Sequence, residues 1–472
     1  MDKTKSLSVP CDAVLYAKGT NQYRDWCDSL TEEHMHALEE FVTAHIPDRG
    51  RARVQPGISN GSYNMVVRFS LDLGGGDIAL KLPKPGHSAG TLAAEKVANE
   101  AAWIQFLKEK TTIPVPYVYS YGTEPGHLSP LELPYILMDW VPGDNLREFL
   151  ASSPSEELLS IIYQQIASFY LELHRVPFEG IGSVAKDKMT GQWSMRRPLT
   201  MDMHQLVLGV SNYPTNDWPT GKFTNAKNYL NFVWNLQSKQ LWNLRNLNAP
   251  REQAAKGHDP VQPLSSEDIA RLRFEARYRF KQLSNSSKFC LCDNLGPFYA
   301  FNPDLDMRNM TVDTTTGQIL GVFDLEFTNA MPAQFACDPP LSLFKVLPGP
   351  ALDAGYFAWF LGEYKPVIEQ FLDAMRREEL KLGIDPFGQK SLSRKMRDSW
   401  ESKRVWFNYG LTHSDYIDAL YWAVFHGLHP GGIAPELPAE VKVEMESYVQ
   451  QVQYKLAEYE DSWVSHLRET RR

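Results

Sequence analysis

Two aspartates and an asparagine stand in a pattern that suits a magnesium-bound nucleotide. Asp304 lies five residues before Asn309, and Asp324 follows at the end of a second apolar run. The chain between Asn309 and Asp324 predicts a strand, a polar turn at Gly317 and a second strand, so a hairpin brings the three side chains together. Phosphoryl transfer from ATP needs such a set, because one carboxylate orients the attacking hydroxyl while an amide and a second carboxylate hold Mg²⁺. A surface hairpin with ordinary turn residues is the alternative.

A lysine and a glutamate upstream are expected to face each other. Lys81 lies inside the apolar strand predicted at 78–82, where a charge is costly unless it is paired. The helix predicted from about 93 to 108 places Glu100 on its apolar face. ATP-dependent kinases use such a pair to hold a lysine against the phosphates. The alternatives are a snorkelling Lys81 with a solvated Glu100, or a pair that uses Lys84 and Glu95.

Two more segments are candidates for contacting the nucleotide. A glycine turn is predicted between two strands within 54–67, and its small residues could approach a phosphate closely: Gly57, Ser59, Gly61 and Ser62. The apolar strand at 134–143 runs into a turn and suits an adenine pocket, with Met138 as a wall. The main chain of Asp139 and Val141 would supply the acceptor and the donor. Each segment is also typical of an ordinary hairpin turn or of a strand that leads into a loop.

Length, charge and cysteine content narrow the class of protein. A chain of 472 residues suits two lobes, and a net charge of −9 offers no electrostatic footprint for nucleic acid or an anionic membrane. No apolar run has the length of a membrane span, and the N-terminus lacks a signal-peptide core. Five cysteines indicate a reducing compartment, and Cys290 with Cys292 suits alternate positions of a strand better than a metal site. We therefore expect a cytoplasmic protein with a small-molecule partner.

The remaining chain is predicted to be mostly helical. A capping box at 29–32 opens an N-terminal helix that ends near Ile46, and a strong helix spans 156–175. The segment 184–265 is rich in tryptophan and asparagine, which suits either core packing or a substrate pocket. A helix in the tail 436–472 could pack on the lobe or mediate a homodimer.

The order of these parts resembles the aminoglycoside-phosphotransferase family, which has a protein-kinase-like fold, and is most similar to its fungal branch of small-molecule kinases. That order is a glycine loop, a strand lysine, a helix glutamate, a hinge, a D-x-x-x-x-N string and a later aspartate. The resemblance covers roughly residues 30–430. Further strings similar to the family are Asn99-Glu100-Ala101-Ala102 with Ile113-Pro114-Val115-Pro116, Phe178-Glu179-Gly180-Ile181-Gly182-Ser183, and Met396-Arg397-Asp398-Ser399-Trp400-Glu401 with Trp406.

The resemblance implies a two-lobed α+β fold of the protein-kinase type. Residues 1–141 would form a nucleotide-binding lobe with an antiparallel sheet and a helix, and 142–472 a mostly helical catalytic and substrate-binding lobe with an insertion at about 184–290. By the same resemblance Asp304 is the catalytic aspartate, Asn309 and Asp324 are Mg²⁺ ligands, Lys81 contacts the α- and β-phosphates, and Glu100 positions Lys81.

The chain departs from the family pattern at two places. Asn302 stands where the family usually has a histidine, which puts the rigidity of the loop in question. Asp324-Leu325-Glu326 replaces the D-F-G string of protein kinases, and we expect Glu326 to cap a strand rather than bind the metal. The sequence therefore predicts an ATP- and Mg²⁺-dependent kinase that phosphorylates a hydroxyl of a small molecule. A nucleotide-binding pseudokinase scaffold and a protein kinase are the alternatives.

Overall fold

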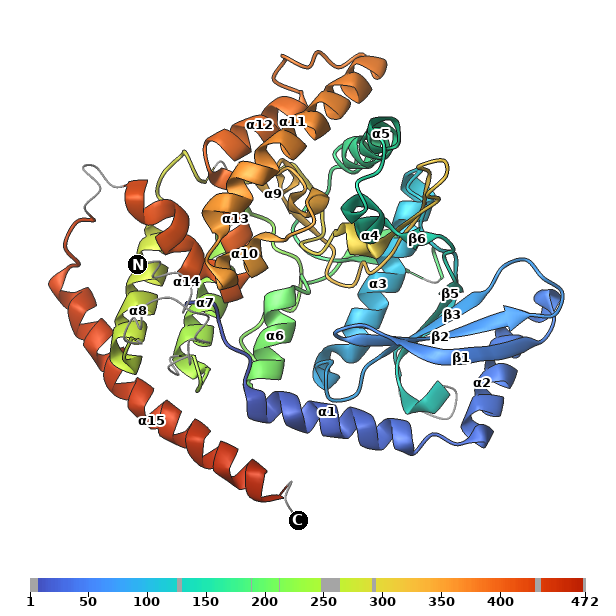
Figure 1. The fold of residues 1–472 in the computed structure, drawn as a ribbon, viewed down its shortest axis with the longest axis horizontal. Coiled ribbons are helices and arrows are strands. Elements are labelled where there is room, and N and C mark those ends of the chain that lie inside the picture. Colours follow the sequence, from blue (N-terminus) through green and yellow to red (C-terminus); the bar gives the residue numbers. More distant parts are fainter. Residues whose placement is uncertain are drawn as a thin grey trace.

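A computed structural model describes residues 7–124, 130–187, 189–211, 213–247, 264–290, 294–428 and 434–469. The chain forms a small lobe built on an antiparallel sheet and a larger, mostly helical lobe, as predicted (Figure 1). The sheet has five strands in the order β1-β2-β3-β5-β4. Their bounds are β1 (Ala52–Asn60), β2 (Asn64–Leu71), β3 (Ile78–Pro83), β4 (Val118–Gly122) and β5 (Tyr135–Asp139).

Successive side chains of a strand point to opposite faces of the sheet, and apolar side chains lie on both faces. Helices therefore cover both faces of this sheet. Leu80 in β3 belongs to a cluster with Val42 of helix α2 (Glu32–His45). The neighbouring Ala79 belongs to the other cluster, together with Trp103 of helix α3 (Gly90–Lys110). This alternation turns Lys81 toward α3, since Lys81 follows Leu80 in the strand.

The N-terminal part of the chain differs from the prediction. Helix α1 (Ala13–Asp28) was not expected, and the capping box of α2 uses Thr31 and His34 rather than the residues at 29 and 32. Figure 1 shows α1 along the lower edge of the molecule, between α6 and α2. The chain ahead of α1 contacts the large lobe, where Val9 N donates to Asp415 O over 2.8 Å. The residues ahead of α1 thus contact the large lobe, and the division of the chain near residue 141 stays a prediction.

The large lobe surrounds a few short strands with helices. Its helices are α4 (Leu146–Ala151), α5 (Glu156–Leu173), α6 (Met201–Gly209), α7 (Ala226–Asn243), α8 (Ser266–Leu283), α9 (Ala333–Ala336), α10 (Pro348–Ala354), α11 (Phe357–Lys381), α12 (Leu392–Glu401), α13 (Arg404–Thr412), α14 (Ile417–Leu420) and α15 (Ala439–Glu469). Its strands are β6 (Asp144–Asn145), β7 (Val184–Lys186), β8 (Trp193–Met195), β9 (Phe298–Phe301), β10 (Met310–Val312), β11 (Ile319–Val322) and β12 (Asn329–Pro332).

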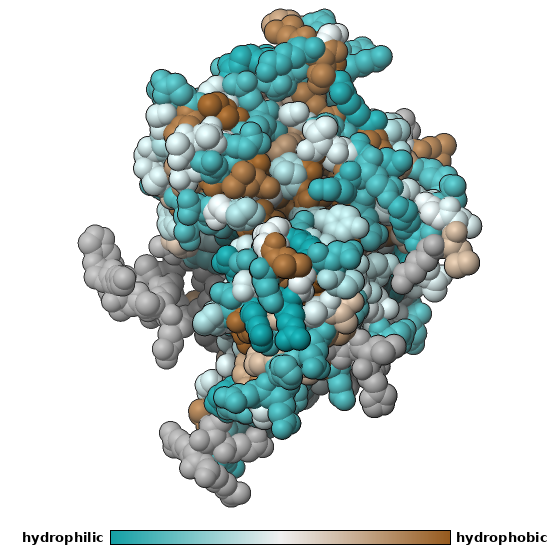
Figure 2. Space-filling model, turned by 90° about the vertical axis from the view of Figure 1, so that its right-hand side faces the viewer, coloured by the Kyte–Doolittle hydropathy of each residue, from teal (hydrophilic) through white to brown (hydrophobic). Residues whose placement is uncertain are grey.

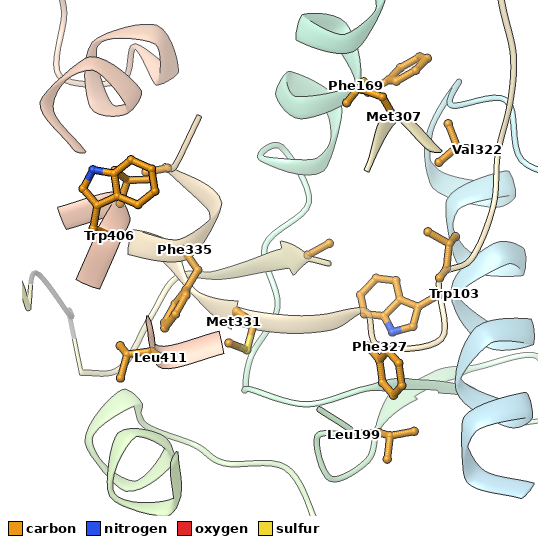
Figure 3. Close-up of a cluster of buried hydrophobic side chains, with 14 of the residues drawn as sticks. Trp103, Phe169, Leu199, Met307, Val322, Phe327, Met331, Phe335, Trp406 and Leu411 are labelled. Carbon is orange, nitrogen blue, oxygen red and sulfur yellow. The ribbon is translucent and has the colours of Figure 1, made fainter. Parts of the chain in front are cut away.

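One apolar core joins the two lobes. Trp103 on α3 is fully buried and lies beside Phe327, while Met331 and Phe335 carry the same cluster toward Trp406 on α13 (Figure 3). Phe327 follows Asp324 by three residues. The core thus fixes the segment that contains Asp324 against the helix that contains Glu100.

The tryptophan-rich insertion and the C-terminal helix are part of the folded large lobe. Trp218 and Trp234 are buried, with 5% and 8% of their surface exposed, so core packing accounts for both. Helix α15 packs on α8, and its Val449 shares a cluster with Phe274. The C-terminal helix therefore packs on its own lobe, and a homodimer stays a prediction. The loop predicted at 251–263 lies outside the described residues.

The surface of the small lobe drawn in Figure 2 is mostly hydrophilic, with apolar side chains in separate groups. Within the described ranges, no helix is both long enough and apolar enough to cross a membrane.

Candidate active site

The predicted hairpin forms and brings the two expected metal ligands to its open end. Strands β10 and β11 pair antiparallel, with Met310 opposite Val322. Phe323 N then donates to Asn309 O over 3.0 Å, beyond the last strand pair. Asp324 is the next residue, and its φ of 64° lies in the left-handed region that most side chains avoid. This backbone turn ends the strand and begins the segment that runs toward α3.

Asn302 holds the loop around Asp304 together. Its Oδ1 accepts a hydrogen bond from Asp304 N over 2.9 Å, and its Nδ2 donates to Asp324 O over 3.2 Å. Asn309 Nδ2 donates to Asp304 O over 2.9 Å, so the loop is fixed on its other side as well. The asparagine at the family's histidine position thus bridges the loop to Asp324 instead of leaving the loop loose.

Two residues that the sequence analysis missed complete this loop. Arg308 Nη2 lies 3.2 Å from Asp306 Oδ2 and 3.8 Å from Asp304 Oδ1. Asp306 is buried and also faces Arg147 Nη1 at 3.6 Å. Burial raises the pKa of Asp304 to about 7, and the Asp324 charge adds to this rise. A carboxylate with a pKa near neutral suits a general base.

Lys81 contacts two carboxylates at once. Its Nζ lies 2.7 Å from Glu100 Oε2 and 2.7 Å from Asp324 Oδ1. Burial alone would lower the pKa of Lys81, but Asp324 and Glu100 hold it above its usual value, so the ammonium stays charged. Lys81 and Glu100 are buried, as alternation along the strand and helix predicts.

The alternative pair is excluded by its contacts. Glu95 Oε1 accepts from Arg197 Nε over 2.8 Å, and the Lys84 ammonium lies 4.5 Å from the centre of the Tyr23 ring. Glu95 and Lys84 therefore each have another partner, and they do not pair with each other.

A second buried ion pair lies next to the first, and the sequence analysis did not identify it. Lys96 Nζ lies 3.1 Å from Glu326 Oε2, which also accepts from Asn64 Nδ2 over 2.8 Å. Lys96 Nζ in turn donates to Asn64 Oδ1 over 2.8 Å, and Asn99 Nδ2 to Glu326 O over 2.7 Å. Lys96 precedes Glu100 by one helical turn, so the two charges lie on the same face of the helix. This spacing was the feature of the sequence that could have revealed the second buried pair.

The expectation that Glu326 caps a strand is wrong, because its carboxylate is buried against Lys96. Although burial opposes this, Lys96 and Lys81 hold the pKa of Glu326 below its usual value. Carboxylate oxygens of Glu100, Asp324 and Glu326 lie within 4.8 Å of one another. The two lysine ammonium groups offset two of the three carboxylate charges, and of the three carboxylates only Asp324 is substantially exposed, with 29% of its side-chain surface accessible.

The glycine turn lies further along the chain than predicted. Strand β1 continues to Asn60, and Gly57, with φ 91°, stands at an irregularity between Val54 and Ile58 where the register shifts. Gly57 and Ser59 are therefore strand residues, because this bulge lets pairing with β2 continue past the glycine. The turn itself comprises residues 61–63, and Gly61 N donates to Asn64 O over 2.8 Å. Contacts of Gly57, Ser59, Gly61 and Ser62 with a nucleotide stay a prediction.

The connection between the lobes packs on the β10–β11 hairpin. Met138 is buried, and Asp139 N donates to Tyr117 O over 3.0 Å, which ties the end of β5 to the chain before β4. A Cβ at Gly321 would lie 2.2 Å from Val141 Cγ1, so only glycine in β11 leaves room for this valine. The nucleotide contacts of Met138, Asp139 and Val141 stay predictions. Cys290 lies outside any strand, and Cys292 lies outside the described residues.

Residues 55–369 match the family model described as "Phosphotransferase enzyme family", which is more than half of the chain. The chain belongs to this family. Curated relatives include two proteins named "Altered inheritance of mitochondria protein 9, mitochondrial". The Meyerozyma guilliermondii protein is 24% identical over 308 residues, which cover 60% of this chain and 49% of the relative. The Candida tropicalis protein is 33% identical over 132 residues, which cover 27% of this chain and 21% of the relative.

Among solved structures, a GDP complex of a variant aminoglycoside 2'-phosphotransferase-IIIa aligns with a TM-score of 0.42 and 12% identity. The alignment covers 92% of this chain and 98% of that chain. The chain spans about half or less of the length of the curated relatives above.

The expected cytoplasmic location is overturned, because these relatives are named as mitochondrial proteins. Free cysteines indicate a reducing compartment, and that property does not distinguish the cytosol from other reducing compartments.

Proposed function

We propose that this phosphotransferase transfers the γ-phosphoryl group of ATP, with Mg²⁺, to a hydroxyl group of a small molecule. The observation that carries the proposal is the contact of Lys81 with both Glu100 and Asp324 at 2.7 Å. A lysine between a helix glutamate and a metal-binding aspartate is the arrangement that ATP-dependent kinases use.

The donor set suits a magnesium ion. Mg²⁺ binds hard oxygen ligands, commonly one or two carboxylates together with substrate phosphates. Asp324 offers a partly exposed carboxylate beside Lys81, and the Asn309 nitrogen is used by Asp304 O, which leaves the Asn309 amide oxygen for the metal. When bound, Mg²⁺ would neutralise charge on the phosphates.

In an in-line transfer, each of these residues would have a separate role. Asp304 would orient the acceptor hydroxyl and accept its proton, which its raised pKa favours. Lys81 would hold the α- and β-phosphates, and Glu100 would keep Lys81 in place. Asn302 would fix the distance between the base and the metal ligand, since it bonds to the main chain of both.

Two measurements test the proposal. Calorimetry should detect nucleotide binding that strengthens with Mg²⁺, and a coupled ADP assay should detect ATP consumption when hydroxylated small molecules are added. Nucleotide binding without turnover on any acceptor would favour the pseudokinase scaffold. Phosphate transfer to protein would favour the protein kinase. Absence of Mg²⁺-dependent nucleotide binding would overturn the proposal.

A further inference from the structure

A large cavity lies beside the glycine turn, between the two lobes. Its volume is about 670 Å³, within the range of small-molecule sites. The small lobe contributes the turn at 61–63 and the loop that carries Lys84 and His87. The large lobe contributes Gln240 of α7, Asp415 and the end of α6, and the segment at the start of α1 also lines the cavity.

The cavity lies near the candidate catalytic centre. Asp304 shares a neighbouring cavity of about 120 Å³ with Thr412 and His413, and Asp415 follows two residues later in the large cavity. On the small-lobe side, Tyr63 lines the large cavity and precedes Asn64, whose Nδ2 bonds Glu326 over 2.8 Å. Burial raises the pKa of Tyr63, and the nearby charges of Asp415, Glu326 and Asp304 raise it further. A ligand in the large cavity would therefore lie beside the glycine turn and near Asp304.

The large-lobe wall of the cavity holds a carboxyl group without an ion-pair partner among the described residues. Asp415 accepts a hydrogen bond from Gln240 Nε2 over 2.9 Å, and the described residues place no lysine, arginine or histidine nitrogen within 4.0 Å of it. Asp12, the other acidic residue of the cavity, is neutralised by Arg245 Nε at 2.7 Å. Gln240 is 5% exposed, and within the described part of the chain its Oε1 has no hydrogen-bond partner.

The small-lobe wall holds an uncompensated cation. The Lys84 ammonium lies over the Tyr23 ring, and no carboxylate of the described ranges lies within ion-pair distance of it. His87 beside it stays neutral near pH 7, because burial and Lys84 lower its pKa below the usual value. The cavity thus presents one acidic group, whose pKa burial raises to about 7, and one cation, on opposite lobes.

We propose that this cavity is the acceptor site and that the acceptor is a small zwitterionic alcohol, with its ammonium group at Asp415 and its anionic group at Lys84. The proposal rests on the proposed function. A partly buried charge is stabilised by an opposite charge, so a ligand with one of each sign satisfies both walls. A polycation would leave most of its amines without a carboxylate and would face Lys84.

The residues that select the acceptor would lie in the wall of this cavity. Asp415 and the start of α1 lie outside residues 55–369, the part that matches the family model. The proposed catalytic residues and the small-lobe wall with Lys84 lie inside that range, so only part of the cavity lies outside it. In the reaction the acceptor oxygen bonds to the γ-phosphorus and the bond to the β–γ bridging oxygen breaks. The hydroxyl proton passes to Asp304, which leaves a phosphate monoester and ADP.

The test compares acceptors of different charge in the ADP assay with the full chain. The panel holds zwitterionic alcohols (serine, threonine, homoserine), cationic amino alcohols (ethanolamine, choline), an anionic hydroxy acid (glycerate) and the polycation kanamycin. We expect the highest kcat/KM with a zwitterionic alcohol. A preference for kanamycin or choline, or nucleotide binding with no turnover on any zwitterion, would overturn the acceptor class.

Charge variants locate the site. Asp415→Asn and Lys84→Met should each raise the acceptor KM at least about tenfold, with the KM for ATP unchanged, because each removes one charged contact. Asp28→Asn and Lys18→Met make the same changes at exposed positions of α1 and should leave both KM values unchanged. An unchanged acceptor KM in both cavity variants would place the acceptor elsewhere. If either cavity variant fails to fold, the other still decides the outcome. Loss of Mg²⁺-dependent nucleotide binding in the wild-type chain would instead refute the proposed function.

Discussion

The side chain of Asn302 donates a hydrogen bond to the main-chain carbonyl oxygen of Asp324, with the two atoms 3.2 Å apart. Its oxygen accepts from the Asp304 amide, so one side chain sets the spacing between the proposed base and the proposed metal ligand. Asn302→Ala should lower kcat about 10- to 100-fold with little change in the KM for ATP, because small misplacements of reacting groups are costly. Asn302→His, which restores the family residue, should retain more activity than alanine. Equal kcat values for wild type and Asn302→Ala would refute the bridging role.

Asp304→Asn should abolish most of the transfer while nucleotide binding persists. The amide cannot accept the hydroxyl proton, and a positioned base contributes about 10² to 10⁴ in rate. Steady-state assays give kcat, and calorimetry gives the affinity for an ATP analogue. Asp313→Asn in the turn of the hairpin is a suitable control, because its carboxylate binds only turn residues. Near-normal turnover in Asp304→Asn would exclude it as the base.

Asp324→Ala should weaken the part of nucleotide affinity that depends on Mg²⁺. The change removes a hard oxygen ligand and also frees Lys81 from one of its two carboxylates. Calorimetry with and without Mg²⁺, on wild type and variant, separates the metal effect from the loss of the Lys81 contact. If Mg²⁺ strengthens binding equally in both proteins, Asp324 is not a ligand.

Lys81 and Glu100 should behave as one unit in a double-mutant cycle. Lys81→Ala removes the phosphate contact, and Glu100→Gln lets Lys81 move away from the phosphates. Since both changes disable the same contact, the double variant should be hardly worse than Lys81→Ala alone in ATP-analogue affinity. Glu95→Gln breaks the separate pair with Arg197 and should not alter this affinity. Strictly additive losses would mean that Lys81 and Glu100 act independently.

The carboxyl group of Asp338 should make stability depend on pH. Burial raises the pKa of Asp338 to about 7, and its oxygens accept hydrogen bonds from Ser399 and Asn408. A raised pKa means that the folded chain holds this proton more tightly, so the stabilisation is full below the unfolded pKa near 4 and is lost as pH rises through 7. Asp338→Asn keeps an uncharged side chain at every pH. It should gain about 1 kcal/mol or more over wild type at pH 8 and almost nothing at pH 4.5, as measured by denaturant midpoints. An equal difference at both pH values would contradict the shift.

Local patterns predicted the small lobe and the catalytic hairpin well. The burial of Lys81 and Glu100 follows from strand alternation and helical spacing, and the hairpin follows from a polar turn between two apolar runs. These features depend on residues close together in the chain, which is why a single sequence reveals them.

Long-range contacts explain what the sequence did not predict. Helix α1 buries only Val14 and Gly19 in a largely polar segment, so its apolar spacing gives a weak signal. Glu326 looked like a strand cap because its partner Lys96 stands on a distant helix and meets it only after the lobes pack. The cavity was also hidden, because Lys84 and Asp415 come from opposite ends of the chain.

Helix α3 carries Lys96 and Glu100 one turn apart, and each forms a buried ion pair with a different segment. Protein kinases are switched by moving the corresponding helix, which separates its glutamate from the lysine. Here an outward swing would separate two buried pairs at once. Lys81 would keep Asp324, but Glu326 would lose Lys96, and leaving a buried charge unpaired costs about 3–5 kcal/mol. A gap of about 3 kcal/mol or more leaves the swung-out conformation at less than about one molecule in a hundred. Helix α3 would therefore keep Glu100 against Lys81 most of the time. The reaction rate would then depend on the concentrations of nucleotide and acceptor rather than on a regulatory movement of this helix.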